Sequence, residues 1–156
     1  MLKLKLSVLI LSAFLLTGAS NDVVIAPKSS SIQKDTLNWK LLGVIKFVKK
    51  PHKEYGEVNY PVVNPKLKSL HKKKVVMTGY IVPIDNTHYA LSKNVFAACF
   101  FCGKAGPETI IGLKFRNPKR YKTDQYVTVE GTFRVNENNV DDWIYNMEDV
   151  VVVKGD

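Results

Sequence analysis

From Lys74 to the end of the chain, short apolar segments with strand-like periodicity recur at regular intervals. Five candidate strands are separated by turn-forming residues: 75–84, 89–92, 109–115, 125–135 and 143–153. The first of them carries Gly79 in its middle, where a strongly bent strand favours glycine. Five short strands, with no long helix between the last two, predict a mainly β chain with a small five-stranded antiparallel barrel. The OB-fold is the best match, and a β-sandwich ranks second because it usually needs more strands.

Residues 125–135 show the clearest alternation of apolar and polar side chains. One face of this segment is apolar and consists of Val127, Val129, Phe133 and Val135. The opposite face carries threonine, glutamate and arginine, as expected for a strand with one side in water. We therefore expect the apolar face of this strand to form part of the core.

The segment before the barrel begins with a short predicted helix. Apolar residues recur at about helical spacing from Leu37 to Ile45, and Asp35 or Thr36 is a suitable N-cap. The helix should end near Gly43, because glycine commonly follows the last helical turn.

Residues 44–48 then alternate like a strand, and a proline-rich stretch follows. Three prolines keep residues 50–66 extended or looped, namely Pro51, Pro61 and Pro65. The chain is therefore predicted to contain an N-terminal helix and a proline-rich extended wrap over residues 36–73, followed by an OB-like barrel over residues 74–154.

The first nineteen residues have the features of a secretory signal peptide. Lys3 and Lys5 precede an apolar run over residues 6–16, and small residues lead to Ala19. The run is shorter than the roughly 20 apolar residues of a transmembrane helix. We expect cleavage near Ala19 and an exported protein, periplasmic or secreted, whose residues 20–35 form a flexible tether.

The charge of the chain is strongly basic, with 23 basic and 14 acidic residues. Cleavage after Ala19 removes two lysines, so 21 basic residues remain and the net charge becomes +7. Since an exported protein seldom meets nucleic acid, we expect no nucleic-acid partner. A solvated basic face, or weak attraction to an anionic membrane surface, explains the charge more simply.

The chain contains two cysteines, Cys99 and Cys102, and only two residues separate them. This spacing lets both sulfurs face one point, so that they can form a disulfide or bind a soft metal. Zn(II) and Cu(I) suit a pair of thiolates, whereas calcium or magnesium would need oxygen ligands. Glycines and a proline follow at once, so we place the pair on a loop.

A tetrahedral zinc site needs four ligands, and the cysteines supply two. His88 and Glu108 are the nearest further candidates in the sequence. Each also has a simpler explanation, because His88 belongs to a polar turn at 85–88 and Glu108 suits a solvated strand end. A two-coordinate Cu(I) site, or a dimer that donates four sulfurs, would need neither residue.

Four features occur in order along the chain. They are Trp39 with Leu41 and Leu42, the segment YPVVNP at 60–65, the segment VMTGYIVPI at 76–84, and Ala98-Cys99 before a glycine and proline turn. In this order they resemble an uncharacterised family of bacterial exported proteins with an OB-like core. In that family a Gly-aromatic-aliphatic-Val-Pro-Leu strand is followed by an Ala-Cys-Ile-His segment. Here Cys99-Phe-Phe-Cys102 replaces Cys-x-His, so only Cys99 matches and Cys102 is a substitute thiol.

Some members of this family are encoded beside transporter components linked to metal uptake, so the resemblance implies a metal-transport component as a partner. The sequence thus favours an accessory protein that binds a soft metal or a metallo-cofactor, and no residue is assigned a catalytic role. Two alternatives stay open: a thiol–disulfide redox protein, and a binding module in which Cys99 and Cys102 form only a structural disulfide. Redox activity usually requires a thiolate at a helix N-terminus, whereas turn and strand residues follow Cys102.

Overall fold

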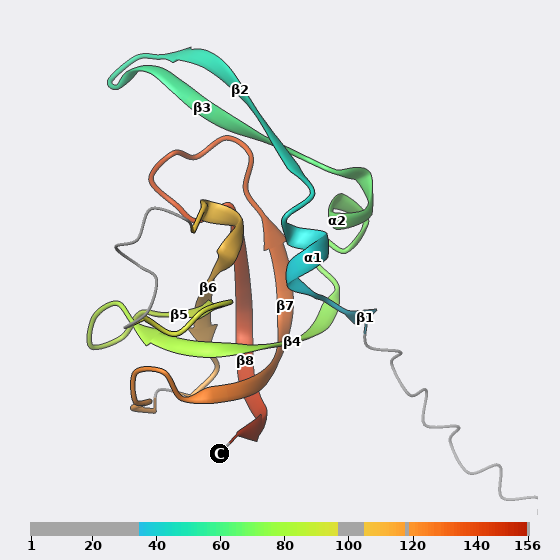
Figure 1. The fold of residues 1–156 in the computed structure, drawn as a ribbon, viewed down its shortest axis with the longest axis vertical. Coiled ribbons are helices and arrows are strands. Elements are labelled where there is room, and N and C mark those ends of the chain that lie inside the picture. The colour runs from blue at the N-terminus through green and yellow to red at the C-terminus, as the bar shows by residue number, and fades with distance from the viewer. Residues whose placement is uncertain (1–34, 97–104, 118, 156) are drawn as a thin grey trace, which may run out of the picture. The chain divides into compact units, whose positions relative to one another are not determined.

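The core of the fold is a closed five-stranded barrel, seen in a computed structural model that describes residues 35–96, 105–117 and 119–155 (Figure 1). Its strands are β4 (Lys74–Pro83), β5 (Tyr89–Ser92), β6 (Ile110–Phe115), β7 (Tyr126–Val135) and β8 (Tyr145–Gly155). The predicted small β-barrel is therefore confirmed. The predicted signal peptide, its cleavage near Ala19 and residues 20–34 of the predicted tether lie outside the described residues.

The strands follow the order β4-β5-β6-β8-β7, and β7 closes the barrel by pairing with β4. Four of these five pairings are antiparallel, but β6 and β8 run parallel. The expectation of a fully antiparallel barrel is thus wrong for one pairing. The reason is topological. β7 crosses to the far side of the barrel to pair with β4. Its hairpin partner β8 therefore lies beside β6 and runs in the same direction as β6. This order is that of an OB-like barrel.

The long strand β4 closes the barrel by pairing with two other strands. Its residues from Lys74 to Tyr80 pair with β7, and those from Tyr80 to Pro83 pair with β5. Gly79 lies beside this changeover, and a Cβ atom there would be only 2.6 Å from the carbonyl oxygen of Ser92. The glycine predicted for the middle of this strand is therefore required by a close approach of two backbones.

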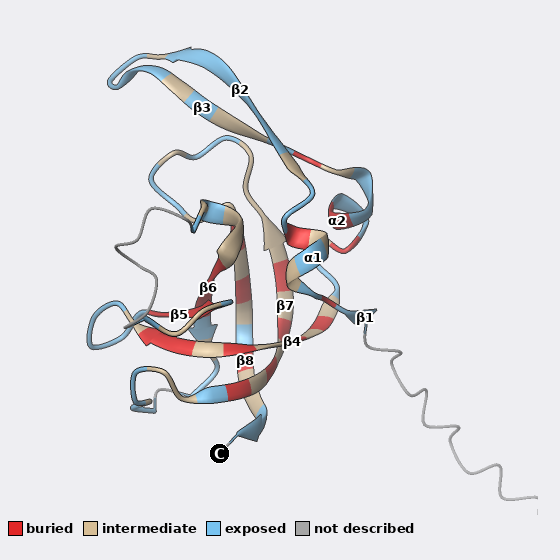
Figure 2. Cartoon of the chain, in the orientation of Figure 1, coloured by how far each residue is buried: buried red, intermediate tan, exposed pale blue. Residues whose placement is uncertain are grey.

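The barrel interior holds the hydrophobic core (Figure 2). In β7 the predicted alternation is confirmed: Val127, Val129 and Phe133 are buried and Val135 is partly buried against the core, whereas the alternating polar residues are less buried than the first three. The largest fully buried side chains from the other strands are Met77, Ile81, Leu91, Ile111, Tyr145 and Met147. Since every barrel strand contributes, the core depends on the barrel being closed.

The first helix, α1 (Trp39–Leu42), is one turn long and starts later than predicted. Its N-cap is Asn38, whose Oδ1 accepts the N–H of Leu41 at 2.9 Å. The predicted caps, Asp35 and Thr36, instead form the short strand β1 (Asp35–Thr36), which pairs in parallel with β4. The barrel edge therefore competes successfully for residues that could otherwise cap a helix.

The proline-rich stretch folds as a hairpin, formed by β2 (Ile45–His52) and β3 (Gly56–Val63), and then as the helix α2 (Pro65–Ser69). Pro51 pairs with Glu57, and Pro61 pairs with Phe47. The N–H of Val63 donates to Glu137 Oε1 at 3.0 Å and so points away from β2. By the two-residue period of a strand, both prolines occupy pairs that exchange no hydrogen bond, and their missing N–H groups leave the ladder intact.

Candidate functional site

The segment that contains Cys99 and Cys102 lies outside the described residues, which stop at Phe96 and resume at Ala105. The two ends of this segment are held at one end of the β5–β6 pair. Lys93 N–H donates to the carbonyl oxygen of Thr109 at 3.0 Å, directly beyond the last strand pair of Ser92 with Ile110. On the return side, the short 3-10 helix η1 (Pro107–Thr109) is closed by the Thr109 hydroxyl, which donates to Gly106 O at 2.7 Å.

His88 lies at the opposite end of β5 from this segment. It precedes Tyr89, whose partner in β6 is Leu113, whereas the cysteine segment follows Ser92. Its Nδ1 is 2.7 Å from Asp85 Oδ2. Asp85 Oδ1 accepts the backbone N–H groups of Thr87 and His88 at 2.7 and 2.8 Å. These hydrogen bonds hold the pKa of Asp85 well below its usual range. His88 therefore belongs to the polar turn at 85–88, which was the simpler of the two explanations that the sequence offered for it.

Glu108 lies close to the cysteine segment, on the three residues of η1. Its side chain is partly buried and folds back over Gly106, so that a Cβ atom on Gly106 would collide with the Glu108 carboxylate. The structure thus separates the two weaker metal-ligand candidates by the length of β5 and brings only Glu108 near the described ends. Within residues 35–96, 105–117 and 119–155, no three histidine, cysteine, aspartate or glutamate side chains gather as metal ligands.

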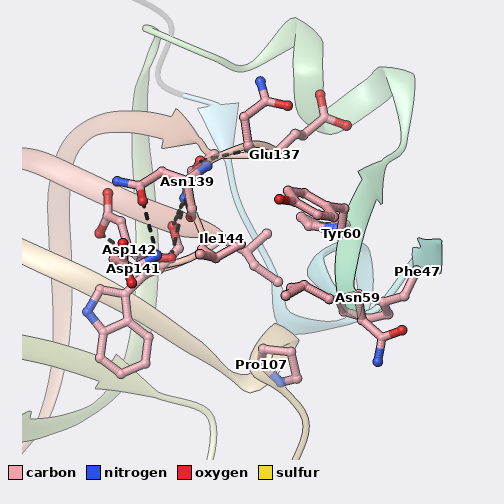
Figure 3. Close-up of a pocket in the computed structure, with 15 residues that line it drawn as sticks. Phe47, Asn59, Tyr60, Pro107, Glu137, Asn139, Asp141, Asp142 and Ile144 are labelled. Carbon is pink, nitrogen blue, oxygen red and sulfur yellow. Dashed lines mark hydrogen bonds between the residues drawn. The ribbon is translucent and has the colours of Figure 1, made fainter. Parts of the chain in front are cut away.

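A small cavity of about 180 Å³ lies at the base of the cysteine segment and is bounded by Val95, Gly106, Ile110 and Trp143. A larger groove, of about 720 Å³, lies between the β2–β3 hairpin and the β7–β8 loop, residues 136–144. Trp143 and Pro107 contribute to both cavities. Figure 3 shows Tyr60 and Ile144 pointing toward one another across the groove, with Pro107 below them.

Two contacts attach the hairpin to the β7–β8 loop on either side of the groove. At the base, Glu137 accepts the N–H of Val63 at 3.0 Å and pairs with Lys68 Nζ at 2.8 Å. At the tip, the Tyr55 hydroxyl donates to Asp141 Oδ1 at 3.0 Å, and this hydrogen bond raises the pKa of Tyr55. The groove is therefore a space between two elements that are tied together, rather than a gap beside a free hairpin.

The β7–β8 loop is also held by its own side chains. Asn136 Oδ1 accepts the N–H groups of Asn138 and Asn139 at 3.1 and 2.9 Å, and its Nδ2 donates to Asn139 O at 2.6 Å. Asn139 Oδ1 then accepts the N–H of Asp141 at 3.0 Å. The side chains of Asn136 and Asn139 thus hold the loop through Asx-type contacts. The sequence did not predict the groove, because the opposite wall comes from a hairpin about 80 residues earlier in the chain.

We expect the attachment at Glu137 to weaken in acid. Burial raises the pKa of Glu137, but the hydrogen bonds from Lys68 and Val63 and the charges of Lys68 and Lys50 outweigh it, so the pKa lies below the ordinary 4.5. A depressed carboxylate pKa stabilises the folded state above the unfolded-state pKa, and this stabilisation is lost as the pH falls through the folded-state value. The Val63 amide proton should shift with a midpoint below pH 4.5 in an NMR titration. The same titration of Glu137→Gln should lack this transition; if it persists there, another group causes it.

No helix in the part of the chain that the structure describes is long and apolar enough to cross a membrane. Comparisons with protein-family models, with curated proteins and with solved structures gave no match to this chain. The family resemblance drawn from the sequence therefore stays a prediction.

Proposed function

We propose that this protein is an exported accessory protein that binds a soft metal ion, Zn(II) or Cu(I), or a metallo-cofactor, through Cys99 and Cys102. The observation that carries the proposal is the spacing of these two residues, the only cysteines of the chain. Two thiolates at this spacing can share one soft ion, which neither thiolate binds as firmly alone. A metal-transport component is the partner that the family resemblance suggests.

The described ends of the cysteine segment support this function. They are fixed to the barrel by backbone hydrogen bonds at Lys93 and Thr109, so the segment starts and ends on a rigid support. Glu108 stands at the return of the segment and can supply an oxygen ligand or orient a bound water. His88 is engaged with Asp85 at the far end of β5, so we assign it no ligand role.

A disulfide between Cys99 and Cys102 is the alternative, with either a redox or a structural role. A redox-active pair usually has its thiolate stabilised at the N-terminus of a helix. The first helical residues described after Cys102 form η1, which has three residues and leads directly into β6. On this return side, η1 is too short to serve as the helix that such a thiolate needs.

The decisive experiment is native mass spectrometry of the protein taken from the exported fraction without reductant or chelator. We expect a bound Zn(II) or Cu(I) ion that is lost in Cys99→Ser and in Cys102→Ser and is retained in His88→Gln. Glu108→Gln should retain the metal but weaken its affinity by roughly tenfold, as loss of a carboxylate that supports a metal site does. The circular dichroism spectra of both serine variants should remain those of the folded barrel.

A metal-free monomer that lacks two hydrogens would overturn metal binding and establish the disulfide. The reduction potential of the pair would then decide between its two roles, because structural disulfides are much harder to reduce than redox-active ones. Failure of Cys102→Ser to fold would favour the structural role.

A further inference from the structure

The groove beside the hairpin exposes the free edge of a β-strand. Four consecutive residues of β3, Val58 to Pro61, line it. Alternate side chains of a strand point to opposite faces. A cavity that contacts four consecutive residues therefore lies along the edge of the strand. The N–H of Val63 points away from β2 toward Glu137, so by the two-residue period the N–H and C=O groups of Asn59 also point away from β2.

No strand in the described part of the chain pairs with this edge of β3, because the hairpin sheet consists of β2 and β3 alone. An unpaired edge presents backbone donors and acceptors that another extended chain can use. Over residues 58–61 these are the N–H and C=O of Asn59 and the C=O of Pro61, which has no N–H. The opposite wall is the β7–β8 loop, which contributes the apolar side chains of Val140 and Ile144. A segment in the groove would therefore have a backbone partner on one side and apolar contacts on the other.

The charge of the lining selects the kind of segment. All charged lining residues are acidic: Glu137, Asp141 and Asp142. Glu137 is paired with Lys68, whereas Asp141 and Asp142 form no ion pair with another described residue, and both are exposed. A basic side chain on the ligand would complement these two carboxylates, which lie toward the hairpin tip where Tyr55 contacts Asp141.

A competing position for the basic side chain is the ring of Tyr60, but that ring already has a cation beside it. The Lys50 ammonium lies 5.4 Å from its centroid. The ligand's basic group is therefore assigned to the aspartate end of the groove.

We propose that this groove binds an extended peptide segment of a partner protein, which pairs with the free edge of β3 and places a lysine or arginine at Asp141 and Asp142. The mode is strand addition, in which the backbone supplies affinity and alternate side chains supply specificity. Residues 58–61 span roughly 13 Å, enough for four or five residues of an added strand. The groove volume of about 720 Å³ also lies within the range of ordinary ligand sites. The proposal does not use Cys99 or Cys102.

The first test uses a displayed library of random heptapeptides, selected against the exported protein, with the best sequence synthesised as the probe. We expect selected sequences to alternate apolar and polar residues and to carry a lysine or arginine near one end. Titration calorimetry should show that Asn59→Pro weakens binding of this peptide at least about tenfold, since it removes the edge N–H and leaves a carbonyl on the peptide unpaired. Asn59→Ala keeps the N–H and should bind within about twofold of the wild type.

Lys49→Pro is the matched control for Asn59→Pro. Lys49 is the partner of Asn59 in the same strand pair, and its N–H faces the other edge of the hairpin. Both prolines therefore disturb the hairpin equally, but only one removes a donor from the groove. Equal effects of the two prolines on peptide binding would overturn strand addition.

The charge assignment is tested by Asp141→Asn, which keeps an acceptor oxygen for Tyr55. We expect it to weaken the peptide roughly threefold to tenfold at low salt and to reduce the salt dependence of binding. Asp149→Asn removes the same charge at an exposed position outside the groove, with φ of 52° that asparagine also tolerates, and should leave binding unchanged.

Further outcomes would overturn the peptide proposal. If sedimentation shows a dimer that Asn59→Pro dissociates and Lys49→Pro does not, a second copy of the chain occupies the groove. If the library yields no peptide that protects the Asn59 amide from hydrogen exchange in the wild-type protein, the edge is not a peptide site. This exchange measurement stays decisive even if Asn59→Pro does not fold.

Discussion

Replacement of Gly79 by alanine is expected to lower the free energy of unfolding by about 2–3 kcal/mol, which is toward the upper end for overpacking a core. The added Cβ would lie 2.6 Å from Ser92 O and 2.9 Å from side-chain atoms of Leu91 and Trp39. The Trp39 ring can move, at some cost to the hydrogen bond from its Nε1 to Thr78 O, 2.8 Å long. The Ser92 carbonyl has less freedom, because Ser92 ends the β4–β5 ladder. Urea unfolding followed by tryptophan fluorescence measures the loss.

Gly43→Ala is the control for this prediction. A Cβ on Gly43 would be 3.5 and 3.6 Å from its nearest neighbours, the carbonyl oxygens of Trp39 and Lys40, which is ordinary contact. The residue has φ of −69°, a conformation that alanine adopts without strain. We expect no loss of stability, and a gain of up to about 1 kcal/mol from the less flexible unfolded chain. If both alanines destabilise equally, the close approach at Gly79 is not the cause.

The barrel could be predicted from the sequence because the apolar pattern of each strand lies within that strand's own residues. The burial of Val127, Val129 and Phe133 follows from the two-residue period of β7, and each of the five predicted segments overlaps an observed strand. Strand direction is different, because it depends on which strand lies next to which. The parallel pairing of β6 with β8 follows from barrel closure, which no single segment encodes.

The details of the N-terminal segments depend on tertiary contacts. Asp35 is a good helix cap by its chemistry, yet β1 pairs with the edge of β4, and Asn38 takes the capping position. Pro51 and Pro61 predicted an extended or looped segment, and the segment is extended. In the hairpin both prolines fall in the pairs that need no N–H donor. The spacing of ten residues between the two prolines gives this result only for a hairpin centred on residue 54, and that centre is set by the observed register.

The candidate sites were predictable to different degrees. The Cys-x-x-Cys spacing is visible in the sequence, and its chemistry follows from the spacing alone. The groove depends on Tyr55 meeting Asp141 and Val63 meeting Glu137, contacts that span 86 and 74 residues of sequence. Its walls also contain ordinary residue types, so neither composition nor motif points to it.

Replacement of Phe133 by alanine should cost about 3–5 kcal/mol of unfolding free energy, the largest single effect expected from a core side chain here. Phe133 is fully buried in β7 and stacks on Tyr145 of β8, with ring centroids 5.9 Å apart. Tyr145 in turn donates its hydroxyl to the carbonyl oxygen of Leu42 at 3.0 Å, which fixes α1 to the barrel. The cavity left by Phe133→Ala would therefore loosen both the barrel wall and the attachment of the first helix. Urea unfolding, with hydrogen exchange at α1, would measure the two effects.

Phe47→Ala makes the same replacement, phenylalanine by alanine, in the β2–β3 hairpin. Phe47 is 40% exposed there and lines the groove. We expect it to cost less than about 1 kcal/mol, because Phe47 lies outside the hydrophobic core and keeps 40% of its surface in water in the folded state. A cost close to that of Phe133→Ala would mean that the hairpin is part of the core. A small cost would mean that residues on this side of the groove can be changed without unfolding the barrel. Any loss of peptide binding in Phe47→Ala could then be attributed to the groove itself, because the fold that supports it is unchanged.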